Sequence, residues 1–210
     1  MELVKTRINS GKVLCLGERN GGLSLWFALQ GYTVVCSDFR GPRKEALLLH
    51  KRYNLENNIT YEDINVFEIN YPDSSFDVIA CKSVIGGLKL DYSDKSTRTI
   101  ENQKLAVNEI RRVLKAGGVF CGVENMRGSL VHVMMRKFLK GDKIGWRHLK
   151  ISEIEELFEK YSELKVQCNG FLGSYYSFKL ANLFTSNIDS LLSKILPDSW
   201  LYIGFIFARK

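Results

Sequence analysis

The chain has 210 residues, of which 45% are hydrophobic and 25% charged, and its formal net charge is +7. These values are typical of an ordinary globular domain with a full hydrophobic core and argue against a disordered or low-complexity protein. No apolar run approaches the roughly 18 residues of a membrane-spanning helix, and residues 1–10 lack the apolar core of a signal peptide. We therefore expect one domain over residues 1–210.

The cysteines, at positions 15, 36, 81, 121 and 168, are odd in number, and four of them lie in apolar strand-like runs. This placement favours buried thiols over a disulfide framework. Reduced thiols predict a cytoplasmic protein. No close Cys/His pair has the spacing of metal ligands, so we expect no metal site.

The first pattern in chain order is an apolar strand at 12–17 that enters a glycine turn and opens a helix over 21–30. Asn20 is a suitable N-cap for this helix and Gly31 a suitable stop. A second strand, 33–38, ends on Asp38, which lies 21 residues beyond Gly17. Such a turn brings backbone close to a ligand and places an acid for ribose hydroxyls, so the pattern predicts a nucleoside site.

Further along the chain, short apolar runs alternate with segments of helical period, which predicts a parallel sheet covered on both faces. Ala116-Gly-Gly118 is expected to end the third helix, and Ser152 with Glu155 has the spacing of a capping box. The later strands are predicted at 58–63, 75–82, 117–124, 163–169 and 200–208, and the later helices at 42–54, 99–115 and 151–161.

Two segments exceed a minimal alternation. Residues 125–149 contain an additional apolar and basic helix over 130–139, and residues 171–198 separate the last two strands. Both segments are candidates for a lid or substrate wall, or else for core packing or a dimer surface. The chain could accordingly be a monomer or a homodimer.

Basic residues gather at 40–52 and at 136–150. They indicate either solvated helix faces or an anionic partner, which could be a phosphorylated small molecule, nucleic acid or a membrane surface. Aromatic residues are not interleaved with them at a clear period, which makes nucleic acid the less favoured partner. The charges of 171–207 are too few to decide on peripheral membrane contact.

Taken together, the motifs resemble those of class I S-adenosylmethionine-dependent methyltransferases, in particular the small-molecule, type 11-like branch. The resemblance runs from about residue 10 to the end of the chain, and its motifs are Gly17 to Gly22, Asp38, Asp63, Phe76-Asp-Val-Ile79, Leu114 to Gly118 and Arg147-His-Leu149. It implies a Rossmann-like, doubly wound α/β fold. The implied sheet has seven strands in the order 3-2-1-4-5-7-6, the last antiparallel, with helices on both faces.

The resemblance also implies S-adenosylmethionine as cofactor. Gly17 would pass close to its methionine portion, Asp38 would accept from the ribose hydroxyls, and Asp63 from the adenine amino group with Ile64 on the ring. The positions implied for cofactor binding are Gly17, Glu18, Arg19, Gly21, Asp38, Phe39, Asp63, Ile64 and Lys82.

Two positions depart from the family pattern. Cys15 stands where an acid is usual, and Arg19 stands at the middle glycine. The Arg19 side chain could bind the cofactor carboxylate as a fork, swing outward to pair with an acid, or clash with the cofactor.

Methyl transfer needs alignment of the nucleophile and exclusion of water, and an oxygen nucleophile also benefits from a base. His148 is the first candidate, because histidine changes charge near neutral pH; ordering a loop or capping a helix is its other interpretation. Glu124 is the second candidate. Ser83, Trp146 and Arg147 are predicted to border the acceptor, and metal-independent chemistry is expected.

The leading hypothesis is thus an O-directed methyltransferase for a small hydroxylated acceptor, such as a sugar of a polysaccharide or a natural-product intermediate. A second hypothesis is a non-catalytic binding module with a degenerate turn, motivated by Cys15 and Arg19. A nicotinamide oxidoreductase is disfavoured because the turn lacks Gly-x-Gly-x-x-Gly spacing. A nucleic-acid or protein methyltransferase remains an alternative.

Overall fold

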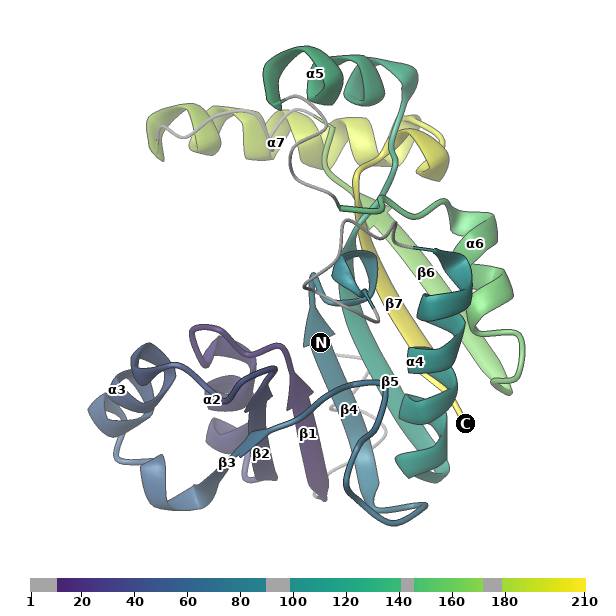
Figure 1. Cartoon of the computed structure of the whole chain (residues 1–210). Coiled ribbons are helices and arrows are strands. Elements are labelled where there is room, and N and C mark those ends of the chain that lie inside the picture. Colours follow the sequence, from purple (N-terminus) through teal and green to yellow (C-terminus); the bar gives the residue numbers. More distant parts are fainter. Residues whose placement is uncertain (1–10, 90–98, 141–145, 172–178) are drawn as a thin grey trace.

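The structure is a computed structural model that describes residues 11–89, 99–140, 146–171 and 179–210 (Figure 1). Residues 1–10, on which the signal-peptide expectation rests, lie outside these ranges, as do 141–145 and 172–178 of the two predicted additional segments. The strands are β1 Lys12–Leu16, β2 Thr33–Asp38, β3 Ile59–Asp63, β4 Phe76–Lys82, β5 Leu114–Asn125, β6 Glu163–Asn169 and β7 Ile203–Arg209. The helices are α2 Gly22–Leu29, α3 Lys44–Arg52, α4 Ile100–Val113, α5 Leu130–Lys140, α6 Ile151–Leu157 and α7 Lys179–Ile195.

The strands form one seven-stranded sheet in the order β3-β2-β1-β4-β5-β7-β6. Strands β1 to β5 pair in parallel, and β7 is antiparallel to both β5 and β6. This confirms the predicted strand order and the antiparallel last strand. The carboxyl ends of β1 to β5 therefore share one edge of the sheet, which is where ligands collect in folds of this kind.

Alternate side chains of each central strand enter two separate hydrophobic cores. Val13 and Cys15 of β1 pack in the core that also contains Phe27 of α2 and Ala46 of α3. Leu14 packs on the opposite face, in the core that includes side chains of α4 and α6. The period of two in a strand produces this division, and it confirms helices on both faces.

Several element boundaries differ from the predicted ones; α6, for example, ends at Leu157 in place of 161, and β7 spans Ile203–Arg209 in place of 200–208. Three further differences concern the helix ends that the sequence signals were expected to set. Gly21, with φ 74°, is the N-cap of α2 in place of Asn20. Helix α6 starts after Lys150, whose backbone N–H donates to Glu153 at 2.8 Å, so the acid of the predicted capping box is Glu153 and not Glu155. Helix α4 ends at Val113, before the predicted glycine stop.

Strand β5 begins at Leu114, and the Ala116-Gly-Gly118 segment lies inside it as an irregularity in the pairing with β4. Leu114 pairs with Phe76 and Val119 with Val78, so the extra residues oppose a single position, Asp77. The glycines thus serve a bulge in the strand, which is a common use of glycine at such sites.

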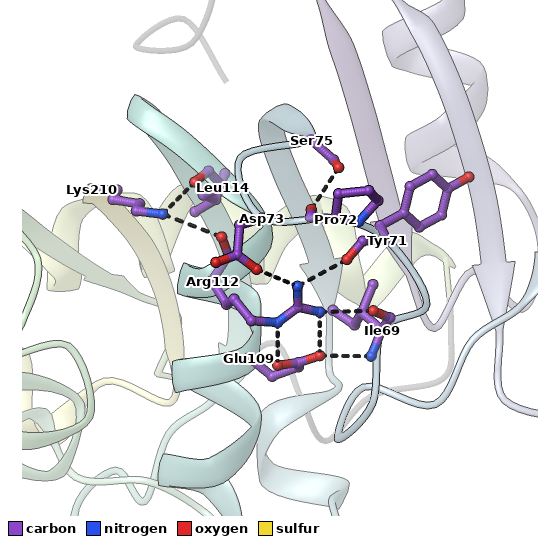
Figure 2. A network of polar contacts seen from close by, with 9 residues as sticks. All are labelled: Ile69, Tyr71, Pro72, Asp73, Ser75, Glu109, Arg112, Leu114 and Lys210. Atoms are coloured by element: carbon purple, nitrogen blue, oxygen red, sulfur yellow. Dashed lines mark hydrogen bonds and ion pairs between the residues drawn. The ribbon is translucent and has the colours of Figure 1, made fainter.

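The connection between β3 and β4 is held by Arg112 of α4, as Figure 2 shows. The guanidinium donates to Glu109 at 2.8 and 2.9 Å and to the backbone carbonyls of Ile69 and Tyr71 at 2.8 and 2.9 Å. It also pairs with Asp73 at 2.7 Å. The connection has no helix of its own in this region, so these contacts are what fixes its course. We call this set of contacts the Arg112 clamp.

Helices α5 and α7 lie beyond the carboxyl edge of the sheet, away from the layers formed by the other helices (Figure 1). The predicted helix at 130–139 is confirmed as α5, and α7 occupies most of the segment between β6 and β7. Within the described ranges no helix combines the length and apolarity needed to cross a membrane. All five cysteines are free thiols, and four of them are buried, as the strand-like runs predict.

Candidate functional site

A cavity of about 790 Å³ opens at the carboxyl ends of strands β1 to β5. Of the residues predicted as functional, it is lined by Gly17, Arg19, Asp38, Phe39, Ile64, Lys82, Ser83 and Trp146. The remaining predicted residues, Glu18, Gly21, Asp63, Glu124, Arg147 and His148, are not part of its wall. The lining comes from segments far apart in the sequence, which the parallel topology brings to one edge.

Gly17 forms the part of the wall that follows β1. Its φ is 67°, and a Cβ atom at this position would lie 2.5 Å from Cγ2 of Val84. Both observations require glycine, because an L side chain is strained at this φ and would collide with Val84. Glycine is therefore required by the packing of Val84 against this turn, and the close approach of a ligand to the Gly17 backbone stays a prediction.

Gly21 has a different task, since it joins the turn to helix α3. A Cβ atom there would lie 2.9 Å from Cα of Ala46. The carbonyl of Gly21 lies 2.9 Å from Nε2 of the buried His50, whose Nδ1 lies 2.7 Å from the hydroxyl of Tyr61. Gly21 and His50 thus hold the turn against α3 and β3 from behind the cavity.

Glu18 is buried, with 6% of its surface exposed, and its carboxylate faces the start of α2. It accepts the backbone N–H of Ser24 at 2.9 Å and the Ser24 hydroxyl at 2.7 Å. A carboxylate here satisfies helix N–H groups that have no partner inside the helix and is favoured by the helix dipole. Glu18 therefore acts as the side-chain cap that Gly21 cannot supply.

Arg19, at the middle position of the turn, is exposed and lines the cavity. Arg43 and Lys82 also line it, so cationic side chains outnumber the carboxylate of Asp38 in the wall. The mixture of one carboxylate with several cations suits a ligand that carries hydroxyl groups at one end and an acid group at the other.

Asp38 closes β2 at the edge of the cavity. Its Oδ1 accepts the backbone N–H of Phe39 at 2.9 Å, and burial raises the pKa of this carboxyl group while the Phe39 N–H, Arg43 and Arg19 act in the opposite direction. Within the described residues, Oδ2 has no protein hydrogen-bond partner. Asp38 thus retains acceptor capacity toward the cavity. The Phe39 ring, 46% exposed, lies beside it.

Asp63 is the last residue of β3 and Ile64 follows it, and the two residues have different roles. The Oδ1 atom of Asp63 accepts the backbone N–H of Arg40 at 2.7 Å, which links the loops after β2 and β3. Arg40 has a φ of 72°, so this bond also holds a strained residue in place. Ile64 is buried to 6% exposure and offers its side chain to the cavity wall.

Ser83 follows β4 and has a φ of 54°. Its backbone N–H donates to the carbonyl of Val123 at 2.7 Å, and its hydroxyl accepts from Nδ2 of Asn125 at 3.2 Å. Asn125 lines the cavity but is absent from the predicted set. Its only signal in the sequence is its place at the end of β5, because strand alternation directs either Glu124 or Asn125 to the cavity without saying which.

Glu124, the residue before Asn125, is buried with 1% exposure. Its carboxylate accepts the backbone N–H groups of Val84 and Ile85, both at 2.8 Å, and that of Gly86 at 3.3 Å. Burial raises the pKa of Glu124 to about 7, against the lowering effect of these N–H donors. The carboxylate thus fixes the turn after β4, which carries Ser83 and Val84 into the wall.

Trp146 covers the same turn from outside. A Cβ atom on Gly87 would lie 2.6 Å from Cζ3 of Trp146, so the indole rests directly on glycine backbone. The indole Nε1 is buried and has no hydrogen-bond partner among the described residues. An unpaired buried donor is costly, and Nε1 lies directly against Gly86, which is not part of the cavity wall.

Arg147 and His148 lie outside the wall. The Arg147 guanidinium pairs with Glu153 of α6 at 2.5 Å and donates to Oε1 of Gln103 in α4 at 2.8 Å. These contacts tie α4 to α6, and the acceptor role predicted for Arg147 stays a prediction. His148 is half-buried two residues after Trp146.

The sequence reasoning also missed the loop after β3, where Asn65, Val66 and Phe67 contribute to the wall. Their only signal was the position of the loop directly after a predicted strand. Within the described residues no group of three or more His, Cys, Asp or Glu side chains could hold a metal ion.

Comparison with known families and structures agrees with this arrangement. The family model of the methyltransferase domain matches residues 14–122. Of curated proteins, none matches the sequence.

Solved structures share the fold over the whole chain. The YcgJ protein from Bacillus subtilis is 20% identical with a TM-score of 0.67, and the match covers 100% of this chain and 96% of that one. A putative methyltransferase from Bacillus halodurans is 17% identical with a TM-score of 0.62, covering 100% and 97%. Phosphoethanolamine N-methyltransferase 2 of Haemonchus contortus, in complex with S-adenosyl-L-methionine, is 17% identical with a TM-score of 0.65, covering 100% and 51%.

Proposed function

Because the chain belongs to the methyltransferase domain family, we propose that it transfers a methyl group from S-adenosylmethionine to a small hydroxylated acceptor, such as a sugar or a natural-product intermediate, in the cytoplasm. The observation that carries the proposal is the cavity that joins the backbone of Gly17 to Asp38 and Ile64. Glycine backbone, an acid and an apolar side chain at successive strand ends are the features that a nucleoside with a charged tail requires.

The residues of the wall divide between the parts of the cofactor. Asp38 would accept hydrogen bonds from the ribose hydroxyls through Oδ2, and Ile64 and Phe39 would pack on the adenine ring. Asp63 keeps one carboxylate oxygen, Oδ2, for the adenine amino group while its other oxygen holds Arg40. Arg19 would bind the carboxylate of the methionine tail, which its planar fork suits.

Glu18 explains why a cation is useful at position 19. In many nucleotide-binding turns the N-terminus of the following helix is the site for an anion. Here the Glu18 carboxylate already occupies the N–H groups at the start of α2. An anionic group of the ligand therefore needs another partner, and Arg19 lies in the wall beside Gly17. Lys82 adds a second cation nearby.

When bound, the cofactor supplies a sulfonium methyl group as the electrophile. The protein contributes alignment of the acceptor oxygen with this methyl group and removal of water. Ser83 and Trp146 border the acceptor in this proposal, and the Asn125 amide holds the Ser83 hydroxyl. His148, which is half-buried two residues after the wall residue Trp146 but is not itself part of the wall, is proposed as the base that takes the proton of the acceptor hydroxyl, because histidine changes charge near neutral pH.

Glu124 enters the proposal as a positioning residue. Its carboxylate is occupied by the backbone N–H groups of Val84 and Ile85 and does not reach the cavity wall. It orders the turn that presents Ser83, and no metal enters the proposed transfer.

The cavity volume limits the group that enters beside the cofactor to about the size of a sugar, a base or a side chain. About 790 Å³ must hold the cofactor together with the acceptor group, which leaves room for a sugar-sized molecule but not for a folded macromolecule. A nucleic-acid or protein acceptor would instead present a flipped base or a side chain.

Calorimetric titration with S-adenosylhomocysteine tests the cofactor, and S-adenosylhomocysteine formation with sugars, nucleotide sugars, phenols, amines and tRNA tests the acceptor. We expect S-adenosylhomocysteine to bind and a hydroxylated compound to be methylated. The variant His148→Ala should lower the rate of this methylation. Absence of binding at millimolar cofactor contradicts the proposal. Binding without turnover by any acceptor class favours the non-catalytic module, and turnover with tRNA or an amine contradicts the acceptor assignment.

A further inference from the structure

Helix α5 presents its apolar side to solvent. Leu130, Val131, Met134 and Phe138 follow one another at helical spacing on one face, and their exposed fractions are 74%, 54%, 57% and 80%. A helix of a water-soluble domain normally buries such a face. These side chains therefore form an unusual surface, and not isolated exposed residues.

The side of α5 that faces the domain carries a buried polar side chain beside the half-buried Val133 and Met135. His132 is buried with 1% exposure, and its Nδ1 lies 2.8 Å from the hydroxyl of Ser129. Its Nε2 lies 2.8 Å from the carbonyl of Phe171, next to the end of β6. The His132 ring also packs against the rings of Phe171 and Tyr202, with centroids 4.9 and 5.5 Å apart, so polar and aromatic contacts together attach this face of α5 to the rest of the protein.

Helix α7 also exposes apolar side chains and buries a polar one. Ile188, Leu191 and Ile195, spaced three and four residues apart, are 47%, 60% and 70% exposed. Asp189, on the other side, is buried and accepts the backbone N–H of Phe171 at 3.0 Å. Both helices thus place a buried polar side chain against Phe171 and leave apolar side chains exposed, while Leu196, directly after α7, packs against the core.

Positive charge accompanies the apolar face of α5. Residues 126–140 contain four basic residues and no acidic one. Arg127 and Lys137 are exposed, as is Lys150 at the start of α6. Lys137 lies next to the apolar face, three residues after Met134 and one before Phe138.

A second cavity, of about 470 Å³, joins this surface to the domain. Its lining includes Leu130, Arg127, Lys150 and Trp200, and the Trp200 side chain is 48% exposed. Tryptophan and cationic side chains around an apolar face are characteristic of the interface between lipid headgroups and acyl chains. The cavity is separate from the one assigned to the cofactor and acceptor.

We propose that α5 and α7 dock the protein on the surface of an anionic phospholipid bilayer. The docking face consists of Leu130, Val131, Met134, Phe138, Ile188, Leu191 and Ile195, with Arg127, Lys137 and Lys150 at its border. An apolar helix face with adjacent cations is the pattern of an interfacial helix. The same cations oppose the joining of two copies through this face, because like charges would meet.

The docking places the reaction site near the lipid surface. Both helices lie beyond the carboxyl edge of the sheet (Figure 1), and the cofactor cavity opens at that edge. Docking depends on no step of the proposed methyl transfer, so the two proposals can fail separately.

Flotation of the full chain with vesicles tests the docking. We expect binding to phosphatidylcholine vesicles that contain phosphatidylglycerol, which weakens as salt is raised, and weaker binding to vesicles of phosphatidylcholine alone. The variant Met134→Ser/Phe138→Ser should lower the partition coefficient by about tenfold or more, from the loss of two buried apolar side chains. The matched control, Leu48→Ser/Leu105→Ser, removes leucines with 57% and 53% exposure on α3 and α4, and should bind as the unaltered chain does.

Two charge-reversal variants test the docking independently of the apolar variant. Arg127→Glu/Lys137→Glu should abolish binding, whereas Lys51→Glu/Arg52→Glu, at exposed positions of α3 with the same change of net charge, should retain most of it. Circular dichroism checks that each variant is folded. Absence of binding to the anionic vesicles, or equal effects of the two charge pairs, overturns the proposal. A lipid-independent dimer in sedimentation that Met134→Ser/Phe138→Ser dissociates assigns the face to a second copy and overturns it as well.

Discussion

The carboxylate of Glu18 caps helix α2 through Ser24, accepting both its backbone N–H at 2.9 Å and its hydroxyl at 2.7 Å. The acid of the glycine turn is therefore part of the turn's own structure and faces away from the cavity. This contact makes the turn rigid before any ligand binds. It also leaves Arg19 as the turn's exposed charged group.

Removal of either partner of this cap should destabilise the protein. Glu18→Ala and Ser24→Ala are each expected to lower the free energy of unfolding by about 1–2 kcal/mol, as for other lost N-caps. The double variant should lose less than the sum, with a coupling of about 1 kcal/mol. Urea denaturation measures these values, and Glu45→Ala, an exposed acid of α3, is the control. Additive losses would contradict a direct interaction.

The periodicity of the sequence was sufficient to predict the sheet, because the apolar strands and the glycine turns are local signals. Asp38 was predictable for the same reason, since it ends a strand at a fixed distance from Gly17. The direction of the Glu18 side chain was not, because a carboxylate at this turn can face either the helix or the cavity. Glu18 faces the helix because Gly21, at the N-cap position, has no side chain to cap it.

Asn125 and Glu124 illustrate a second limit. The end of β5 was predicted to be part of the site, and Glu124 was chosen there because a carboxylate can act as a base. Strand alternation directs one of two adjacent residues into the cavity and the other into the core. The sequence did not determine which side chains of β5 face the cavity. The strand starts at Leu114 and contains a bulge at the glycines that were predicted to end the preceding helix.

Asp38→Asn should weaken cofactor binding without destabilising the fold. The amide loses the charge-assisted hydrogen bonds proposed for the ribose hydroxyls, for an expected loss of about 1.5–3 kcal/mol, or roughly 10- to 100-fold in the dissociation constant. Calorimetry with S-adenosylhomocysteine measures this. Glu155→Gln, at an exposed carboxylate of α6 outside the cavity wall, should bind within about twofold of the unaltered chain. Equal affinities of the two variants would remove Asp38 from the site.

Arg19 can be tested with two ligands on one variant. Arg19→Ala should weaken binding of S-adenosylhomocysteine by about tenfold, the scale of one charge-assisted contact. Methylthioadenosine, which lacks the amino-acid carboxylate, should bind the variant and the unaltered chain equally. A similar loss for both ligands would show that Arg19 acts on the turn or on the nucleoside. Unchanged affinity for both would mean that the side chain is turned away from the ligand.

The Arg112 clamp should couple stability to cofactor affinity. Arg112→Ala frees the loop that carries Ile64 and Phe67, and we expect a loss of about 2 kcal/mol in unfolding free energy, discounted for the partial exposure of the guanidinium. Affinity for S-adenosylhomocysteine should fall as well, because binding must then order the loop. Arg111→Ala, which removes a single donor to the Lys160 carbonyl, is the adjacent control and should leave affinity unchanged.

The buried carboxyl group of Glu124 predicts a pH dependence of stability. Its pKa of about 7 lies above the usual 4.5, so between these values the folded chain holds a proton that the unfolded chain has lost. The contribution of Glu124 to the free energy of unfolding therefore falls as pH rises from about 4.5 through about 7, by about 3 kcal/mol in all, and is constant above.

Glu124→Gln should remove this slope, which urea denaturation across that pH range measures. The variant should also be less stable by about 1–3 kcal/mol, because its single acceptor oxygen can serve Val84 and Ile85 but its amide nitrogen then turns a donor toward the backbone N–H of Gly86. Glu45→Gln, at an exposed acid, should keep the slope of the unaltered chain. If Glu124→Gln retains the slope, then other groups titrate in this range and the N–H donors hold Glu124 ionised. If it loses the slope but not stability, the turn after β4 does not depend on this carboxylate.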